Sequence, residues 1–275
     1  MELYKDVSYQ LSKRLTLQYS TSFGKSSTLF SKAIQPHIYA IYGLVRIADE
    51  VVDTYPGDNK AKVLDDLEVE TYQAIALGYS TNPIVHAFAL TAQQYGITKE
   101  LIAPFFKSMR MDLTPQTYTR STYDAYIYGS AEVIALMCLR VFTRGSAAQY
   151  EQLAPGAKAL GAAYQKVNFL RDIASDYRER GRVYFPGVQF ETFSEADKQT
   201  IIEAIKADFA TAEPAVNALP ISARSAVRLS FLYYQELLKK LERTPTATIK
   251  TTRIRIPNSQ KLALLVAQKT RKSSS

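Results

Sequence analysis

Carboxylate side chains recur at helical spacing in a segment that is otherwise almost entirely apolar. Asp49 and Asp53 are four residues apart within His37–Asp53, where Arg46 and Glu50 are the other charged residues. On a helix, two carboxylates at this spacing project from one face, about 6 Å apart along the axis. Like charges on a buried face are costly unless a cation compensates them. Arg46 alone is one candidate partner, and a solvated acidic stripe is the alternative for this pair taken by itself.

A second row of oxygen-bearing side chains lies in residues 162–176. Gln165, Asn168, Asp172 and Asp176 are three, four and four residues apart, so all four line one helical face. Apolar neighbours again indicate burial. Hard oxygen ligands in two such rows suit Mg²⁺, or Mn²⁺ in its place, especially when phosphate oxygens complete the coordination shell. The two rows together predict helices that face each other across a cavity and hold a metal-bound diphosphate.

Basic side chains that suit the same diphosphate follow the second row. They are Arg171, Arg178, Arg180 and Arg182, followed by Tyr184. The guanidinium fork and the phenol both bind phosphate oxygens. Gly181 is expected to end the helix, so that the segment from Arg182 to Pro186 folds back over the site as a lid. For Arg178 and Arg180, an interaction with the helix dipole fits better than phosphate binding.

A stretch of small residues follows Tyr128 in a third apolar segment. Gly129, Ser130 and Ala131 permit close approach of another helix or of a ligand, and a Gly–Ser pair also permits a kink. The sequence leaves open whether an isoprenoid chain or a packed helix lies there.

These motifs require long helices to position them, and the spacing of apolar residues along the chain predicts such helices. Apolar residues recur every three or four positions, and no series of alternating strands is present. Glycine and proline cut the chain into predicted helices. The predicted helices span 5–20, 26–54, 60–78, 84–95, 98–112, 119–142, 148–153, 156–178, 194–217 and 221–242, with one more after Pro257. We therefore expect a single all-α domain over residues 1–275.

The net charge of +8 is concentrated at the end of the chain. Residues 243–275 carry eight basic side chains and no acidic ones, which leaves the first 242 residues formally neutral. The body of the protein therefore predicts no nucleic-acid partner. Residues 261–269 read as a short helix with an apolar face, which predicts salt-sensitive binding to an anionic membrane surface; packing on the bundle is the alternative.

Cysteine content and the absence of apolar spans bear on location. Cys138 alone cannot form an internal disulfide, and the N-terminus shows no secretory signal. No uninterrupted apolar run approaches the roughly 18 residues that would span a bilayer. We expect a cytoplasmic protein, peripheral at most on the inner membrane face.

Taken together, these motifs resemble the squalene/phytoene synthase family of head-to-head prenyltransferases, and most of all its bacterial phytoene synthase branch. The resemblance runs from Tyr19 to about Leu265. It rests on five stretches, which are Tyr19–Phe23, Ile41–Asp53, Tyr128–Ala131, Gln165–Asp176 and Arg182–Pro186. One departure is Glu50, where many relatives have aspartate.

The resemblance implies a helical isoprenoid-synthase fold with a central apolar cavity, and it assigns roles to individual residues. The implied metal ligands are Asp49, Asp53, Asn168, Asp172 and Asp176, and the four aspartates and Tyr184 are the implied catalytic groups. The implied substrate contacts are Ser20, Ser22, Phe23, Tyr42, Arg46, Tyr128, Gln165, Asn168, Arg171 and Arg182.

The implied activity is the Mg²⁺-dependent joining of two geranylgeranyl diphosphates to phytoene, as in carotenoid biosynthesis, through a cyclopropyl-carbinyl diphosphate and without NADPH. A dehydrosqualene or squalene synthase acting on farnesyl diphosphate remains an alternative, as does a terpene cyclase. From a different class, a non-catalytic family member acting as an assembly factor is also open.

Overall fold

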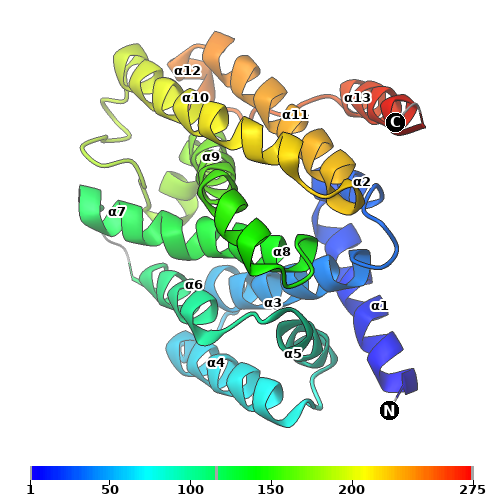
Figure 1. Ribbon diagram of the computed structural model, residues 1–275. Helices are drawn as coiled ribbons and strands as arrows, with labels where there is room; N and C mark the ends of the chain where they lie inside the picture. The colour runs from blue at the N-terminus through cyan, green and yellow to red at the C-terminus, as the bar shows by residue number, and fades with distance from the viewer. Residues whose placement is uncertain (1, 115–116, 274–275) are drawn as a thin grey trace.

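Helices alone make up the regular structure in the computed structural model, which describes residues 2–114 and 117–273, without the side chains of Thr21 and of residues 269–273 (Figure 1). The longer helices are α1 (Glu2–Tyr19), α3 (Gln35–Asp53), α4 (Lys60–Leu77), α5 (Pro83–Tyr95), α6 (Lys99–Met111), α8 (Val133–Phe142), α9 (Ala147–Arg180), α10 (Glu195–Ala218), α11 (Ile221–Arg243) and α13 (Asn258–Ser273). The shorter ones are α2 (Thr21–Ser27), α7 (Arg120–Ile127), the π-helical turn η1 (Tyr128–Glu132) and α12 (Thr246–Ile249).

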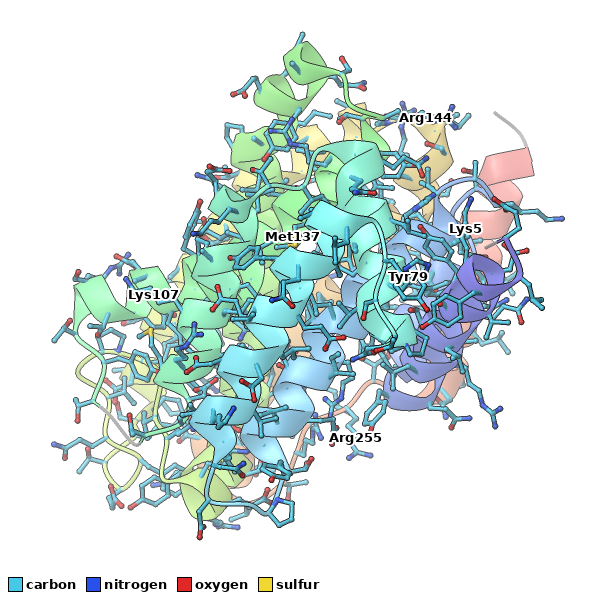
Figure 2. All side chains as sticks on the ribbon, turned by 90° about the horizontal axis from the view of Figure 1, so that it is seen from below. Lys5, Tyr79, Lys107, Met137, Arg144 and Arg255 are labelled. Atoms are coloured by element: carbon cyan, nitrogen blue, oxygen red, sulfur yellow. The ribbon has the colours of Figure 1, made fainter. Side chains whose placement is uncertain are left out.

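Two helices, α3 and α9, carry the predicted acid rows into the middle of the bundle. Helices α1, α4 and α5 pack on α3, whereas α8, η1 and α10 pack on α9. In Figure 1, α10, α11 and α12 lie on one side of α9, and α3 to α8 lie on the other. Side chains sort accordingly in Figure 2: Met137 is buried between helices, and Lys107 and Arg144 reach outward. A single all-helical bundle is therefore confirmed.

The predicted helix over 26–54 is wrong in its first part. Residues 21–27 form α2, the chain then turns, and α3 begins only at Gln35. Pro36, near the start of α3, signals this boundary, because proline suits the first turn of a helix and disfavours helix in the residue before it. The break matters for the site, since it places α2 as a separate short helix beside α11.

The two predicted helices at 148–153 and 156–178 are one continuous helix, α9, with Pro155 in its interior. Tertiary packing overrides the helix-breaking preference of Pro155 and Gly156. A Cβ atom at Gly156 would lie 2.2 Å from the Cβ of Ala215, so the glycine lets α10 approach closely at the very point where the proline weakens the helix.

The predicted helix over 119–142 is continuous but contains the π-turn η1. Such a turn leaves the backbone hydrogen-bond ladder irregular. The Ser108 hydroxyl of α6 donates to the Tyr126 carbonyl at 3.2 Å and so helps satisfy it. Residues 120–142 are long and apolar enough to cross a membrane by composition alone, but 61% of the apolar window is buried in the bundle, which is typical of a core helix.

Candidate active site

A cavity of about 840 Å³ lies between α2, α3, α8, α9 and α11. Both predicted acid rows line it, and so do many apolar and aromatic side chains. Its volume falls at the upper end of the range for ligand pockets. The two rows therefore share one enclosed space, as the spacing predicted.

One arginine joins the two rows directly. The Arg180 guanidinium lies 3.3 Å from the Asp53 carboxylate of α3 and 3.0 Å from the Asp176 carboxylate of α9. Arg182 lies 3.5 Å from the second oxygen of Asp53. For Arg180, the interpretation as a simple helix-dipole contact is therefore incomplete. Arg178, in contrast, donates to the Lys250 carbonyl at 2.9 Å and does not line the cavity.

Asp172 is held by its chain neighbour Arg171 and by Arg253 from a distant part of the chain. Its oxygens accept from Arg171 Nε at 2.9 Å, and from Arg253 at 2.8 Å and 3.1 Å. Arg253 belongs to the basic segment after residue 243, and Arg255 and Lys261 of that segment also line the cavity. The charge pattern of this segment predicted a membrane-facing role and gave no signal for its contribution to the site.

Asp49 and Asp176 have the most strongly perturbed carboxyl groups of the rows. Burial, and then the carboxylate of Asp53, raise the pKa of Asp49 to about 7, against the lowering effect of Arg46. The Arg46 guanidinium is 3.9 Å from Asp49, which is longer than a hydrogen bond. Burial, and then Asp172, raise the pKa of Asp176 to about 6. Both carboxyls thus lie where additional positive charge would stabilise the ionised form.

A buried aspartate that the sequence analysis did not single out lies beside the rows. Asp112, at the end of α6, accepts hydrogen bonds from Tyr126 at 2.5 Å and Tyr184 at 3.2 Å, and Arg182 lies 3.5 Å away. Burial raises its pKa, partly offset by Arg182. A single aspartate in the polar stretch after α6 has no helical partner at i+4, so spacing gave no signal for it.

Tyr184 and its neighbours form a fixed wall of the cavity. Tyr184 is buried and stacks on Phe169 with a ring separation of 4.0 Å, and Phe185 is buried as well. The Arg182 guanidinium donates to the Asp112 carbonyl. The segment that was predicted to be a lid therefore packs against α6 and α9.

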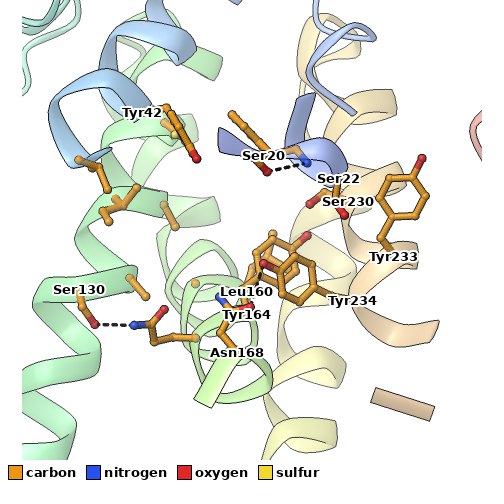
Figure 3. Close-up of a pocket in the computed structure, with 18 of the residues that line it drawn as sticks. Ser20, Ser22, Tyr42, Ser130, Leu160, Tyr164, Asn168, Ser230, Tyr233 and Tyr234 are labelled. Carbon is orange, nitrogen blue, oxygen red and sulfur yellow. Dashed lines mark hydrogen bonds between the residues drawn. The ribbon is translucent and has the colours of Figure 1, made fainter. Parts of the chain in front are cut away.

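The polar residues of α9 are oriented by neighbouring helices (Figure 3). Gln165 donates to the Ser130 hydroxyl at 3.3 Å, and Asn168 accepts from the Tyr234 hydroxyl of α11 at 3.3 Å. Tyr234 in turn stacks on Tyr164 at 3.9 Å. The side-chain oxygen of Asn168 thus points into the same space as the acids.

The start of α2 and the middle of α3 form a further side of the cavity. The Ser20 hydroxyl caps α2 by accepting from the Phe23 amide at 3.2 Å, and the Phe23 and Tyr42 rings stack at 5.4 Å. Glu50 contacts Arg46, whose guanidinium also covers the Tyr19 ring at 4.1 Å. Glu50 does not line the cavity, and it holds Arg46 in place.

The structure brings all but one of the predicted site residues to the cavity. Those that line it are Ser20, Ser22, Phe23, Tyr42, Arg46, Asp49, Asp53, Gln165, Asn168, Arg171, Asp172, Asp176, Arg182 and Tyr184. The exception is Tyr128, whose ring lies 5.4 Å from the Lys158 ammonium; Tyr126 lines the cavity instead. The ring of Tyr128 does not line this cavity, and its contact with substrate stays a prediction.

The small-residue stretch packs against a helix on one side and faces the cavity on the other. A Cβ atom at Gly129 would lie 2.1 Å from the Pro104 carbonyl oxygen, so this glycine allows close packing of η1 on α6. Ser130 and Ala131, on the other side, line the cavity.

The donor set fits divalent metal ions that are also bound by a ligand. Carboxylate and amide oxygens from α3 and α9 line one cavity, which matches the preference of Mg²⁺ for hard oxygen donors. Among the residues that the structure describes, no three such acidic, histidine or cysteine side chains converge to hold an ion by themselves. Asp49, Asp53, Asn168, Asp172 and Asp176 could therefore hold Mg²⁺ together with oxygens of a diphosphate.

Comparison with known proteins defines the class to which this fold and site belong. The family model described as squalene/phytoene synthase matches residues 16–260. The chain belongs to the squalene/phytoene synthase family and is a prenyltransferase of that family.

Individual relatives fall within the same class. The chain is 28% identical over 264 residues to a phytoene synthase of Arthrospira platensis, covering 86% of this chain and 84% of the relative. It is 27% identical over 282 residues to a 15-cis-phytoene synthase of Synechocystis, covering 94% and 83%. A crystal structure of a dehydrosqualene synthase in complex with a ligand superposes with a TM-score of 0.81 at 19% identity, covering 98% of each chain.

Proposed function

We propose that this enzyme joins two geranylgeranyl diphosphates head to head to form phytoene, by way of a cyclopropyl-carbinyl diphosphate and with release of diphosphate, as a step of carotenoid biosynthesis. The observation that carries the proposal is the meeting of two carboxylate rows, from α3 and α9, in one cavity whose remaining wall is largely apolar and aromatic. The curated relatives that are phytoene synthases support the choice of a C20 substrate.

The polar part of the cavity accounts for the departure of diphosphate. Asp49, Asp53, Asn168, Asp172 and Asp176 would hold Mg²⁺, which would supply positive charge to the leaving group. Arg46, Arg171 and Arg182 line the same space and supply fixed positive charge for the diphosphate oxygens. Arg46 and Arg182 are held by Glu50 and Asp112, which lie outside the predicted metal ligands, so these two arginines need little rearrangement when the charge develops.

The apolar part of the cavity accounts for what happens to the allylic cation. Aromatic side chains such as Phe23, Tyr42 and Phe169 line the wall and exclude water that would otherwise capture the cation. The double bond of the second prenyl chain can then react with the cation, and loss of a proton closes the cyclopropane ring of the intermediate. A second ionisation, rearrangement and loss of a second proton give a linear product with a central conjugated triene and require no hydride; the independence from NADPH stays a prediction.

Product analysis tests the proposal. The purified enzyme is incubated separately with geranylgeranyl and farnesyl diphosphate in the presence of Mg²⁺, and the extracted hydrocarbons are identified by mass spectrometry. We expect phytoene from the C20 substrate and no product in excess EDTA. Turnover of farnesyl diphosphate alone would make the enzyme a dehydrosqualene synthase, a second candidate that the structural likeness to such an enzyme favours. No product from either substrate would point to an assembly factor.

We also propose that the enzyme binds reversibly to the inner face of the cytoplasmic membrane, because both the substrate and the product are lipids. Helices α1 and α13 both pack on α2 and lie on the same side of the bundle (Figure 1). Each exposes large apolar side chains, namely Leu3, Val7 and Leu11 on α1, and Leu262 and Val266 on α13. The apolar face predicted for residues 261–269 is in part packed, since Leu264 and Leu265 contact the core.

A further inference from the structure

Arg180 is the one described side chain that contacts a carboxylate of each acid row. Its Nη2 atom lies 3.3 Å from Asp53, and its Nη1 atom lies 3.0 Å from Asp176. Its side chain is 31% exposed and lines the cavity. Gly181, with a φ of +64°, ends α9 directly after it.

The same carboxylate oxygens are those that would ligate a metal ion. An ion bound to Asp53 or Asp176 competes with Arg180 for the oxygen lone pairs, and it also repels the guanidinium as a like charge at short distance. The guanidinium must therefore move aside when an ion binds. Since its side chain lines the cavity, its five donors are available to a diphosphate that the ions would hold there.

We propose that Arg180 couples metal binding to diphosphate binding, acting as the counter-ion of Asp53 and Asp176 until ions bind and as a diphosphate ligand thereafter. This inference rests on the proposed function, because it assumes that the site takes both ligands. Its consequence is cooperative binding. The ions displace Arg180 from the two carboxylates, and the displaced guanidinium then binds the diphosphate. Each ligand therefore binds more tightly when the other is present than when it is alone.

Direct binding measurements on the full-length protein test the proposal without turnover. Mn²⁺ binding is followed by the electron paramagnetic resonance of the free ion, and binding of inorganic diphosphate at saturating Mn²⁺ is followed by calorimetry. In Arg180→Gln we expect Mn²⁺ alone to bind more tightly, because a competing cation is gone. Diphosphate should then bind at least about fivefold more weakly, so that the coupling between the two ligands shrinks.

Arg178→Gln is the matched control, since it removes the same charge two residues earlier on α9 from a side chain that contacts the Lys250 carbonyl outside the cavity. It should leave both affinities within about twofold, well below the range of measured coupling effects. Arg180→Lys keeps a positive charge but concentrates it on one nitrogen. It should bind Mn²⁺ alone more tightly than the wild type while retaining most of its affinity for diphosphate.

The outcomes separate this inference from the proposed function. If the wild-type protein binds neither Mn²⁺ nor diphosphate, the proposed function fails and the inference fails with it. If the wild type binds both, but Arg180→Gln and Arg180→Lys weaken Mn²⁺ binding or match Arg178→Gln, Arg180 only holds the two helices together and the coupling role is wrong. Thermal unfolding of each variant identifies a loss of affinity that comes from a loss of structure.

Discussion

Asp49 has the least compensated carboxylate of the two rows, since Arg46 is 3.9 Å away and burial raises its pKa to about 7. We expect Asp49→Asn to lower turnover at least about 10²-fold, or roughly 3 kcal/mol of barrier, because a ligand for a divalent ion is lost. Steady-state kinetics at saturating Mg²⁺ measure this. The same change at Asp172 should act similarly.

The control for that substitution is Asp66→Asn, which alters an exposed carboxylate paired with Lys62 on α4. It should change turnover less than about twofold, as surface changes usually do. Glu68, on the same helix, is a poor control, because its side chain is only 16% exposed and contacts Arg110. Equal losses at Asp49 and Asp66 would remove the basis for the metal assignment.

The same raised pKa values predict how the enzyme responds to pH. Folded Asp49 keeps a proton up to about pH 7 and Asp176 up to about pH 6, whereas the unfolded chain loses both near pH 4. Because ions bind only the ionised form, the Mg²⁺ concentration for half-maximal activity should rise about tenfold from pH 8 to pH 6. Kinetic Mg²⁺ titrations at several pH values measure this.

The pH dependence of folding stability tests whether the raised pKa values are the cause, because it should run in the opposite direction to the pH dependence of activity. The folded protein binds more protons than the unfolded chain between about pH 4 and pH 7, so without divalent ions its stability should fall as pH rises through that window. Asp49→Asn should make thermal unfolding in EDTA less dependent on pH. An unchanged pH profile in that variant would mean that Asp49 does not titrate as the structure indicates.

At the scale of helices, periodicity predicted the elements that hold the site, and packing decided the details. The paired acids placed α3 and α9 correctly, because residues that are three and four positions apart lie on the same face of a helix. Local sequence could not show that α9 runs through Pro155, since contact with Ala215 of α10 compensates for it. Nor could it find Asp112, whose partners Tyr126 and Tyr184 lie 14 and 72 residues away.

The contact between η1 and α6 leads to a stability prediction. A methyl group at Gly129 would lie 2.1 Å from both the Pro104 carbonyl oxygen and the Ser108 hydroxyl, so α6 would have to move. We expect Gly129→Ala to cost about 2 kcal/mol or more of unfolding free energy, measured by urea denaturation. Gly24→Ala is the comparison, because its new methyl group would meet the end of the Leu17 side chain at 3.2 Å and the Leu17 Cα at an ordinary 3.9 Å. A similar cost for both would rule out the tight contact.

The other side of the same turn leads to a prediction about substrate length. Ala131 lines the cavity, so Ala131→Phe should shorten the space available to a prenyl chain and shift preference from the C20 toward the C15 diphosphate. The ratio of kcat/KM values for the two substrates should change by about tenfold or more, as removal of several methylene-sized volumes suggests. Ala148→Phe, at an exposed position of α9, should leave the ratio unchanged.

At the scale of the whole molecule, the basic end of the chain divides between two roles. Arg253, Arg255 and Lys261 line the cavity, so they are not all available to a membrane. Lys269, Arg271 and Lys272, on which the membrane prediction also rested, lie outside the side chains that the structure describes. The membrane proposal therefore now depends as much on the exposed apolar residues of α1 and α13 as on charge.

Co-sedimentation with anionic vesicles tests that proposal. Binding should be reversible and weakened by salt, and it should fall when Leu262 and Val266 become Ser or when Lys269, Arg271 and Lys272 become Ser, since each cation near such a surface contributes roughly 1 kcal/mol. Replacing Lys62, Lys99 and Lys107 with Ser removes as much charge from exposed positions of α4 and α6 and should have little effect. Binding that is absent at low salt would refute the proposal.

The π-turn at Tyr128–Glu132 is also a place where this chain can change length. A π-turn holds one residue more than an α-helical turn, so deleting one residue there would leave a regular helix in place of residues 120–142. The extra residue is taken up within that single turn, so α7 and α8 would keep nearly the same faces toward the bundle, and Tyr126 would still face Asp112. The contacts that would change are those of the turn itself, where the Ser130 hydroxyl accepts from Gln165 and the Ser108 hydroxyl donates to the Tyr126 carbonyl. A chain one residue shorter here would therefore keep the partners of the buried acid but lose the support of Gln165 in the cavity wall.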